Sequence, residues 1–308
     1  MTSPKLAGAT DHGRMYARTR GGPLEVPSIT TVLDVLNQRM EWWEARCAVD
    51  AAWDWAHRIV EIKANPGDWR TERKAKDWMR NAAERDRDDA SARGDCVHDY
   101  AEVWALHTLG KATTNDVEEQ RSACERAGVL DYIHHFHRFW DDWQPTVVMP
   151  EATVWNTEVG YAGTTDLLCQ VQVQGRTVNV VGDYKTKRSL YKRNGQPKAQ
   201  DLRDYTGMQL AAAAYAEEVW VPGQAEDGSQ DSWKQMDFGA EVGVGIAVAP
   251  DGYVVRQYAI HHPPMWETFK ALRSAWEFSA QGPRMMSGKL GGPGELRLPD
   301  GGNVSAVA

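Results

Sequence analysis

Three consecutive strand patterns between residues 151 and 185 constrain the fold of this 308-residue chain more than any other stretch. Apolar and polar side chains alternate weakly over residues 152–155 and strongly over residues 165–173, and residues 177–184 are apolar and β-branched. Gly175 and Arg176 stand between the last two segments and indicate a tight turn. The sequence therefore predicts an antiparallel meander of three strands.

This meander would bring two aspartates and a lysine together. Side chains two residues apart on a strand share a face, so Asp183 and Lys185 point the same way and Tyr184 points to the other side. The turn at Gly175 folds the neighbouring strand back, which places Asp166 beside Asp183. Carboxylates are ligands suited to Mg²⁺ or Mn²⁺, and a lysine beside such an ion can position or activate water for phosphodiester hydrolysis. An Asp-x-Lys tripeptide by itself is more often an ordinary surface ion pair, so the interpretation depends on the surrounding motifs.

Four short motifs occur around this pair. Residues 163–166 read GTTD and residues 182–187 read GDYKTK, while Gly94 and His98 form a G-x-x-x-H pattern upstream. Downstream, Tyr205 precedes Gln209 and Leu210. In this order, over residues 94–215, the motifs resemble those of the RecB-like exonuclease branch of the PD-(D/E)XK nucleases. Residues 26–33, VPSITTVL, extend the resemblance, because similar openings occur in phage-encoded members of the branch.

The resemblance implies a fold and a set of site residues. The fold is α/β, with a restriction-endonuclease-like mixed sheet flanked by helices and a helical annex before it. Lys185 would position or activate water, and Gln209 would reach either Lys185 or the DNA backbone. The implied catalytic residues are Asp166, Asp183, Lys185 and Gln209, and the implied metal ligands are His98, Asp166, Asp183 and the main-chain carbonyl of Tyr184.

Two glutamates are candidates for positions around these ligands. Glu102 lies four residues after His98, so both share one face of a predicted helix. Glu102 therefore either orients His98 or binds the metal itself. Glu151 directly precedes the first strand and is a candidate acid, because the family often has a glutamate there.

The four cysteines give no metal-binding or disulfide pattern. Cys47, Cys96, Cys124 and Cys169 are widely separated and show no C-x-x-C spacing. Some members of the RecB-like branch carry an iron–sulfur cluster held by four cysteines, three of which follow the helix that contains the Gln-Leu motif. This chain has no cysteine after Cys169. The expected cofactor is therefore Mg²⁺ or Mn²⁺, without an iron–sulfur cluster.

A net charge of −8 argues against a surface that is basic throughout, yet one segment is strongly basic. Residues 185–198 contain six Lys or Arg residues and no acid, and they directly follow the predicted catalytic strand. For any one of these residues a solvated loop is an equally good interpretation, but for the group a DNA path is the better one. The predicted DNA-binding residues are Lys187, Arg188, Lys192, Arg193 and Tyr205.

The chain divides into three predicted parts: a helical annex over residues 1–93, a nuclease core over residues 94–280 and a disordered, Gly- and Pro-rich tail over residues 281–308. Ser28 or Thr30 would cap a first helix that continues at helical spacing to Cys47. Later helices are predicted over residues 95–109, 199–219 and 263–280, with a loop over residues 219–238 and an edge hairpin over residues 242–260. The tryptophans of the annex could stack on bases, although core packing is the favoured interpretation.

The expected function is that of a metal-dependent deoxyribonuclease. Exonuclease action on DNA ends in replication, recombination or repair follows from the resemblance alone. Two other classes stay open: a non-catalytic DNA-end-binding or partner-recruiting subunit of a recombination complex, and a restriction-type endonuclease. The sequence contains no P-loop, so no NTP-driven motor is expected in this chain. The expected partner is DNA with linear or single-stranded ends, and a recombination protein or helicase is a candidate partner. No apolar run is long enough for a bilayer and no signal-peptide pattern occurs, so no membrane partner and a cytoplasmic location in a bacterium or phage-infected host are expected.

Overall fold

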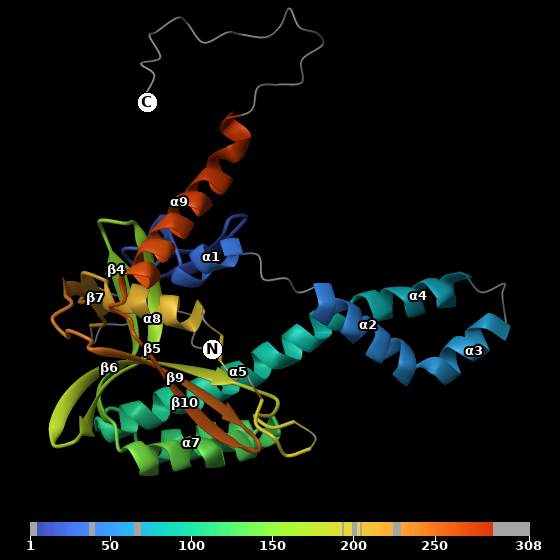
Figure 1. The fold of residues 1–308 in the computed structure, drawn as a ribbon, viewed down its shortest axis with the longest axis horizontal. Coiled ribbons are helices and arrows are strands. Elements are labelled where there is room, and N and C mark those ends of the chain that lie inside the picture. The colour runs from blue at the N-terminus through green and yellow to red at the C-terminus, as the bar shows by residue number, and fades with distance from the viewer. Residues whose placement is uncertain are drawn as a thin grey trace, which may run out of the picture.

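The computed structural model of the chain describes residues 5–36, 41–64, 69–192, 194–198, 202–203, 205–223 and 229–285. The predicted DNA-binding residue Arg193 and residues 286–308 of the predicted tail lie outside the described residues. Figure 1 shows a sheet with helices on both sides and an arm of helices that projects from this body. The predicted α/β fold, a mixed sheet flanked by helices, is confirmed.

A mixed sheet lies at the centre of the body. Its strands are β4 (Thr146–Asn156), β5 (Tyr161–Val173), β6 (Arg176–Thr186), β7 (Glu218–Val221), β8 (Ser232–Gln235), β9 (Val242–Ala249) and β10 (Gly252–Tyr258). They are arranged in the order β10-β9-β6-β5-β4-β7-β8. β5 pairs antiparallel with both β4 and β6, which confirms the predicted meander. The edge hairpin of β9 and β10 is also confirmed, and β9 joins the sheet parallel to β6.

Helices cover both faces of this sheet. One layer contains α5 (Ala82–Thr108), α6 (Thr114–Arg126) and α7 (Leu130–Trp143), and the other contains α1 (Ile29–Leu33), α8 (Tyr205–Ala214) and α9 (Pro263–Met285). Phe136 of α7 packs in one core with Leu167 of β5, while Leu210 of α8 packs in the other core with Leu168. Consecutive residues of β5 thus face different layers, as expected for a sheet buried on both sides. Within the described residues, no helix has the length and apolar character needed to cross a membrane.

The N-terminal residues correct the prediction that the whole annex is helical. β1 (Ala7–Thr10), β2 (Gly13–Ala17) and β3 (Leu24–Pro27) form a separate antiparallel sheet. Tyr16 of β2 is buried in a cluster with Trp155, Ala162 and Trp220 of the central sheet. Strands this short gain their stability from such packing rather than from a local sequence pattern. No local sequence pattern therefore predicted these three strands.

A short helix follows this small sheet. Ser28 caps α1, and its side chain accepts a hydrogen bond from the Thr31 amide, which confirms the predicted cap. The predicted continuation of the helix to Cys47 is wrong, because α1 ends at Leu33 and a 3₁₀ turn, η1 (Asp34–Leu36), succeeds it. Residues 37–40 lie outside the described residues.

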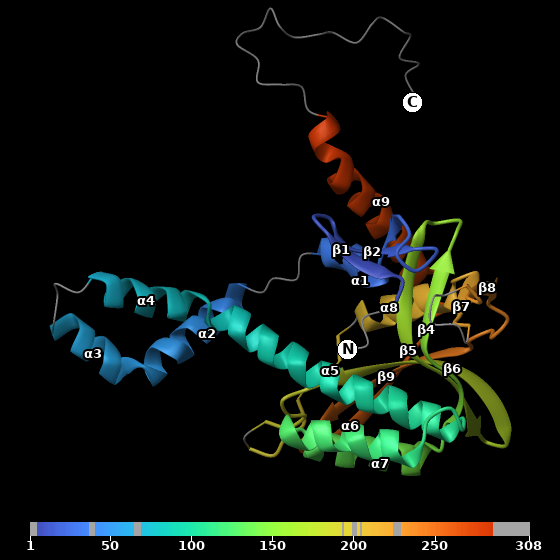
Figure 2. The same ribbon diagram turned by 180° about the vertical axis from the view of Figure 1, so that it is seen from behind.

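The arm consists of α2 (Glu41–Asp54), α3 (Ala56–Ala64), α4 (Trp69–Arg80) and the N-terminal part of α5. Figures 1 and 2 both show α2, α3 and α4 away from the sheet, with α5 as the connection to the body. Trp55 and Trp78 stack within the arm, their ring centroids 4.0 Å apart. α5 is unbroken across residues 93 and 94, where the annex was predicted to end, so the arm and the body share one helix.

Three predicted boundaries in the second half of the chain are wrong. α8 covers Tyr205–Ala214, whereas the predicted helix covered residues 199–219. The predicted loop over residues 219–238 contains β8 and most of β7, because β7 pairs with β4 and β8 pairs with β7. Four-residue strands carry too little alternation to be recognised from sequence. α9 continues to Met285, so residues 281–285 belong to this helix rather than to a disordered tail.

Gly163 on β5 allows α1 to lie directly on the sheet. A Cβ atom at this position would come within 2.5 Å of Ile29 Cδ1 and 2.8 Å of Ile29 Cγ1. We expect Gly163→Ala to lower the free energy of unfolding by about 1 to 3 kcal/mol, the usual cost of overpacking a core. Ile29→Val removes the nearest atom, so the double variant should lose less than the sum of the single variants. Urea unfolding of the four proteins measures this cycle, and strict additivity would contradict the account.

Candidate metal centre

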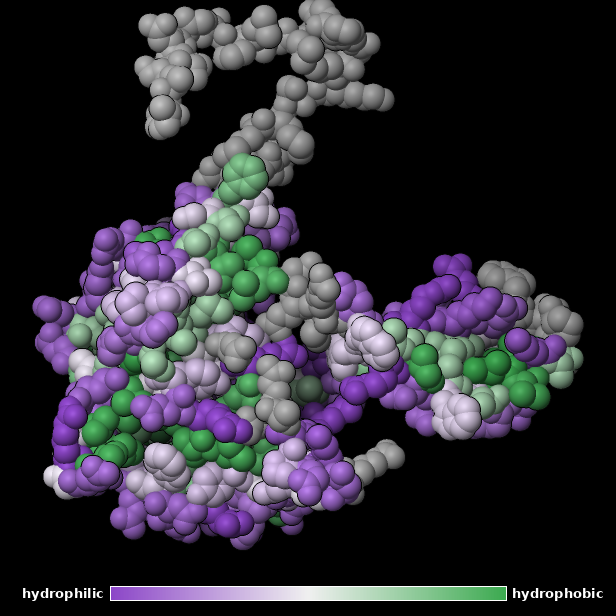
Figure 3. Space-filling view, in the orientation of Figure 1, coloured by the Kyte–Doolittle hydropathy of each residue, from purple (hydrophilic) through white to green (hydrophobic). Residues whose placement is uncertain are grey.

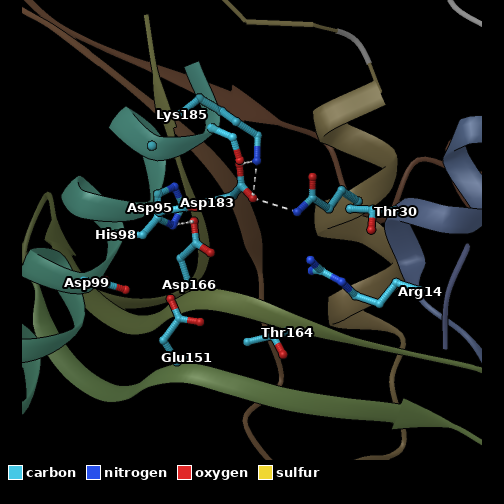
Figure 4. A pocket seen from close by; sticks show the side chains of 13 residues that line it. Arg14, Thr30, Asp95, His98, Asp99, Glu151, Thr164, Asp166, Asp183 and Lys185 are labelled. Carbon is cyan, nitrogen blue, oxygen red and sulfur yellow. Dashed lines mark hydrogen bonds and ion pairs between the residues drawn. The ribbon is translucent and has the colours of Figure 1, made fainter. Parts of the chain in front are cut away.

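A cavity of about 390 Å³ opens where β5 and β6 meet α5 from one layer and α8 from the other. Figure 4 shows side chains from these elements converging on it, together with side chains from the N-terminal strands and α1. The site residues that sequence analysis predicted and that line this cavity are His98, Asp166, Asp183, Lys185, Gln209 and Glu151. Residues far apart in the sequence thus share one cavity.

The pairing of β5 with β6 sets the centre of the site. Leu167 lies opposite Gly182 in the ladder, so the next residues, Asp166 and Asp183, are neighbours on adjacent strands. The Tyr184 amide donates a hydrogen bond of 2.6 Å to Asp166 Oδ2. A strand residue directs its amide and its carbonyl to the same side, so the Tyr184 carbonyl also faces the Asp166 side. The Tyr184 ring packs in the opposite core, as the strand period predicts.

Three side chains in the cavity form a candidate ligand group. One ligand atom from each of His98, Glu151 and Asp166 lies within 4.8 Å of the others. His98 comes from α5, and its Nδ1 atom is 3.5 Å from Asp166 Oδ2. Two carboxylates suit Mg²⁺ or Mn²⁺, and imidazole is a ligand for several transition metals. The residues present therefore fit the expected divalent cation.

Glu151 reaches this group through an uncommon backbone conformation. Its φ angle is 45°, in the left-handed region that residues other than glycine seldom adopt. The β4–β5 ladder pairs Pro150 with Leu167 and Ala152 with Thr165, which puts Glu151 opposite Asp166. A left-handed residue costs on the order of 1 to 2 kcal/mol. Sequence analysis named Glu151 only as a candidate beside the ligands, and the structure brings it into the ligand group.

Asp183 is held by two donors on the other side of the cavity. The residue is 1% exposed, and its Oδ1 atom accepts hydrogen bonds from Lys185 Nζ at 2.8 Å and from Gln209 Nε2 at 2.7 Å. Its Oδ2 atom lies 2.7 Å from the same Lys185 Nζ. Gln209 belongs to α8, so this contact ties the second helix layer to β6. In the structure Gln209 meets Asp183, whereas the expected contact was with Lys185 or DNA.

Burial and neighbouring charges shift the pKa values of the acids and the histidine in the cavity. Burial raises the pKa of Glu151 from its ordinary value of 4.5 to about 9, and the Asp166 carboxylate adds to this rise. Burial lowers the pKa of His98, but the Asp166 carboxylate outweighs it and raises that pKa to about 9. Burial also raises the pKa of Asp183, against the opposing effect of Lys185. A cation that binds here would replace the protons of Glu151 and His98.

One face of α5 supplies several of the polar groups. Asp95, His98 and Asp99 line the cavity, and Glu102, one turn further along, contributes to the raised pKa of Glu151. These four α5 residues follow the helical spacing i, i+3, i+4 and i+7. Sequence analysis named only His98 and Glu102 as site residues. The same helical spacing would also have placed Asp95 and Asp99 on this face.

Arg14 is a cavity residue that sequence analysis missed. It comes from β2, and Figure 4 shows its guanidinium pointing into the cavity from the side opposite His98. Tyr16, two residues further along β2, shares a hydrogen bond of 3.0 Å with the Thr164 hydroxyl of β5. The packing of the small sheet on β5 brings Arg14 to the site, and no local pattern in the sequence signals that packing.

The predicted DNA-binding residues that the structure describes, which are Lys187, Arg188, Lys192 and Tyr205, lie beyond the cavity, on the segment that leaves β6 and at the start of α8. Arg188 forms an ion pair with Asp86 of α5. Lys192 is exposed, and Lys187 and Tyr205 are half-buried. This segment therefore offers positive charge beside the site rather than inside it.

We expect Mn²⁺ or Mg²⁺ to raise the melting temperature of the full chain, because a ligand that binds only the folded state stabilises it. At about 100 times the dissociation constant, the gain in unfolding free energy should be about 2.7 kcal/mol. In His98→Ala and Asp166→Asn the cation should give little of this stabilisation. Glu118→Gln is the control, because it replaces an exposed carboxylate on α6, and it should be stabilised like the wild type. Calorimetry with the cation or with EDTA measures the difference. An undiminished gain in Asp166→Asn would contradict the assignment.

In EDTA, Glu151 should make stability depend on pH. Its folded pKa of about 9 lies above its ordinary value of 4.5, so its contribution to stability is complete below the lower value and disappears as the pH rises through the higher one. We expect the melting temperature to fall between roughly pH 5 and pH 9, and to fall less in Glu151→Gln, which cannot ionise. Glu118→Gln is the matched control. Equal slopes for wild type and Glu151→Gln would show that Glu151 is not the titrating group.

No protein-family model and no curated protein sequence matches this chain. Among solved structures, the crystal structure of SSO0001 is similar over 61% of this chain and 76% of its own, with 14% sequence identity and a TM-score of 0.29. A likeness this distant carries no argument about function, so the chemistry of the site is inferred from its own geometry.

Proposed function

We propose that this chain is a metal-dependent nuclease that hydrolyses DNA phosphodiester bonds, with exonuclease action on DNA ends as the expected mode. One observation carries the proposal: the ligand group of His98, Glu151 and Asp166 shares a cavity with the Asp183–Lys185 pair. The motif resemblance to the RecB-like branch of the PD-(D/E)XK nucleases supports it, because four of these five residues belong to the matching motifs.

Mg²⁺ or Mn²⁺ would be held by His98, Glu151 and Asp166, with Asp183 and the Tyr184 carbonyl as further oxygen donors at the site. When bound, such a cation polarises a phosphodiester and favours the formation of hydroxide from water. Contacts within the chain hold the oxygen donors of Asp166 and Glu151 in position. The Tyr184 amide donates a hydrogen bond to one oxygen of Asp166. Glu151 lies opposite that aspartate, and its backbone is left-handed there.

Lys185 supplies positive charge beside the acids. Burial lowers its pKa, but Asp183 and Asp166 outweigh this effect and raise the pKa above its ordinary value. Lys185 is therefore a stable ammonium group, suited to donating hydrogen bonds and to offsetting charge on a phosphate under attack rather than to removing a proton. Asp183, itself held by Gln209, orients the ammonium. This role favours the positioning of water over its activation by Lys185.

Further groups could bind the nucleic acid. Arg14 reaches the cavity opposite His98, and a guanidinium can contact two phosphate oxygens at once. Thr30 lines the same cavity and offers a hydroxyl. Lys187 and Lys192 on the segment after β6 would extend positive charge along a phosphate backbone. These groups support a nucleic-acid substrate despite the negative net charge of the chain.

The direct test is to incubate the purified chain with end-labelled linear DNA and with closed circular DNA, in Mg²⁺, Mn²⁺ or EDTA. We expect metal-dependent loss of the linear DNA alone, because an exonuclease needs an end. Cleavage of the circles would assign an endonuclease instead. Intact DNA under every condition would contradict the proposal.

In the same assay, Asp183→Asn and Lys185→Ala should each lower the rate of cleavage at least about 100-fold, the usual cost of removing a group that stabilises the transition state. Lys111→Ala, which removes an exposed lysine outside the cavity, should cleave at the wild-type rate. Circular dichroism and melting curves establish that each variant is folded. Cleavage at the wild-type rate by both site variants would contradict the catalytic role of Asp183 and Lys185.

A further inference from the structure

Two cysteine side chains meet where α6 packs on α5. The sulfur atoms of Cys96 on α5 and Cys124 on α6 lie 3.0 Å apart, although the two residues are 28 positions apart in the sequence. No C-x-x-C spacing marks this pair in the sequence. The packing of one helix on the other is what brings the two thiols together.

Hydrogen bonds hold the two thiols against each other. The Cys96 thiol donates to the Cys124 sulfur, and the Cys124 thiol donates to the Cys96 main-chain carbonyl at 3.4 Å. A side chain of α6 thus contacts the backbone of α5, so the two helices approach closely at this point. A disulfide has a sulfur–sulfur distance of about 2.05 Å, so the two sulfur atoms need to approach by only about 1 Å to form one.

The two thiols differ in their surroundings. Cys124 is fully buried in the core that α5, α6 and α7 share with the sheet, whereas Cys96 is half-buried. Burial, and next to it the hydrogen bond with Cys96, raises the pKa of the Cys124 thiol well above its ordinary value. Cys124 therefore keeps its proton until it reacts. Because Cys96 is the more accessible of the two, an oxidant meets it first.

This pair lies on the side of α5 that faces away from the metal centre. Cys96 and His98 are two residues apart, which corresponds to about 200° around a helix axis. His98 lines the cavity, while Cys96 packs against the core that contains Cys124. A bond between the two sulfur atoms would therefore link α6 to the helix that supplies His98 without entering the cavity.

We propose that Cys96 and Cys124 are a redox-sensitive pair, which a peroxide converts into a disulfide that links α6 to α5. The Cys96 sulfur attacks the peroxide, so that an S–O bond forms, the O–O bond breaks and water leaves. The Cys124 sulfur then attacks the resulting Cys96 sulfenic acid. An S–S bond forms, the S–O bond breaks, and a second water leaves with the Cys124 proton. The two thiols are oxidised and the peroxide is reduced, independently of the proposed nuclease activity.

The test is to oxidise the reduced full chain with a small molar excess of hydrogen peroxide, to alkylate the remaining thiols during denaturation, and to digest without reductant. We expect two of the four thiols to disappear. Mass spectrometry should find the Cys96 peptide joined to the Cys124 peptide, with the loss of two hydrogen atoms, and dithiothreitol should separate them. Four remaining thiols, a bond that involves Cys47 or Cys169, or a Cys96 sulfinic acid in place of the disulfide would overturn the proposal.

The bond should also stabilise the fold, because it restricts the unfolded chain between residues 28 positions apart. We expect peroxide to raise the melting temperature of the wild type by about 5 °C and to leave that of Cys96→Ala and Cys124→Ala unchanged. Cys47→Ala is the matched control, because Cys47 lies on α2 in the arm, which Figure 3 shows standing apart from the body. This variant should gain as much as the wild type.

Melting curves of the reduced variants establish that each is folded. If the buried Cys124→Ala change prevents folding, the half-buried Cys96→Ala change still provides the comparison. A wild type that forms the Cys96–Cys124 bond without a rise in melting temperature would overturn the inference that the bond stabilises the packing of α6 on α5. A rise that persists in Cys96→Ala would overturn it as well.

Discussion

The hydrogen-bonded register between β5 and β6 is the constraint on which the rest of the site depends. It places Asp166 beside Asp183 and lets the Tyr184 amide bond to an Asp166 oxygen. A slip of one residue would turn one of the two strands over and send its aspartate to the opposite core. The helix layers contribute His98 and Gln209, and each of these side chains contacts a carboxylate that the two strands present.

This register also gathers charges that burial disfavours. Each of the three central acids is neutralised in a different way: Asp183 by Lys185, Asp166 by His98, and Glu151 by retaining its proton. A buried ion pair that only supported the fold would need neither a third acid nor a left-handed backbone at Glu151. Strained backbone and strongly shifted pKa values are typical of functional sites, where a ligand or substrate uses the arrangement. Electrostatics and backbone geometry thus favour a cation site over a structural cluster.

α5 connects this site to the arm. Its central turns carry Asp95, His98 and Asp99 into the cavity, while its first turns belong to the arm with α2 and α4. The two regions differ in what they expose: the cavity is lined mainly by polar and charged groups, and the arm carries apolar side chains at its surface. Because one continuous helix joins them, the arm is connected directly to the helix that supplies His98.

The sequence by itself determined the features that depend on local geometry. The period of an extended strand puts Asp183 and Lys185 on one face, and the turn at Gly175 joins β5 to β6. The start of the first helix was also predicted, with Ser28 or Thr30 as its cap, and the structure shows that Ser28 is the cap. Only the tertiary structure decided which distant segments meet: the N-terminal strands that bring Arg14 to the cavity, the pairing of β7 with β4, and the place of Glu151 beside His98 and Asp166. Backbone geometry fixes the direction of a side chain within its own element. The contacts between elements depend on packing and hydrogen bonds across hundreds of residues, which no short pattern encodes.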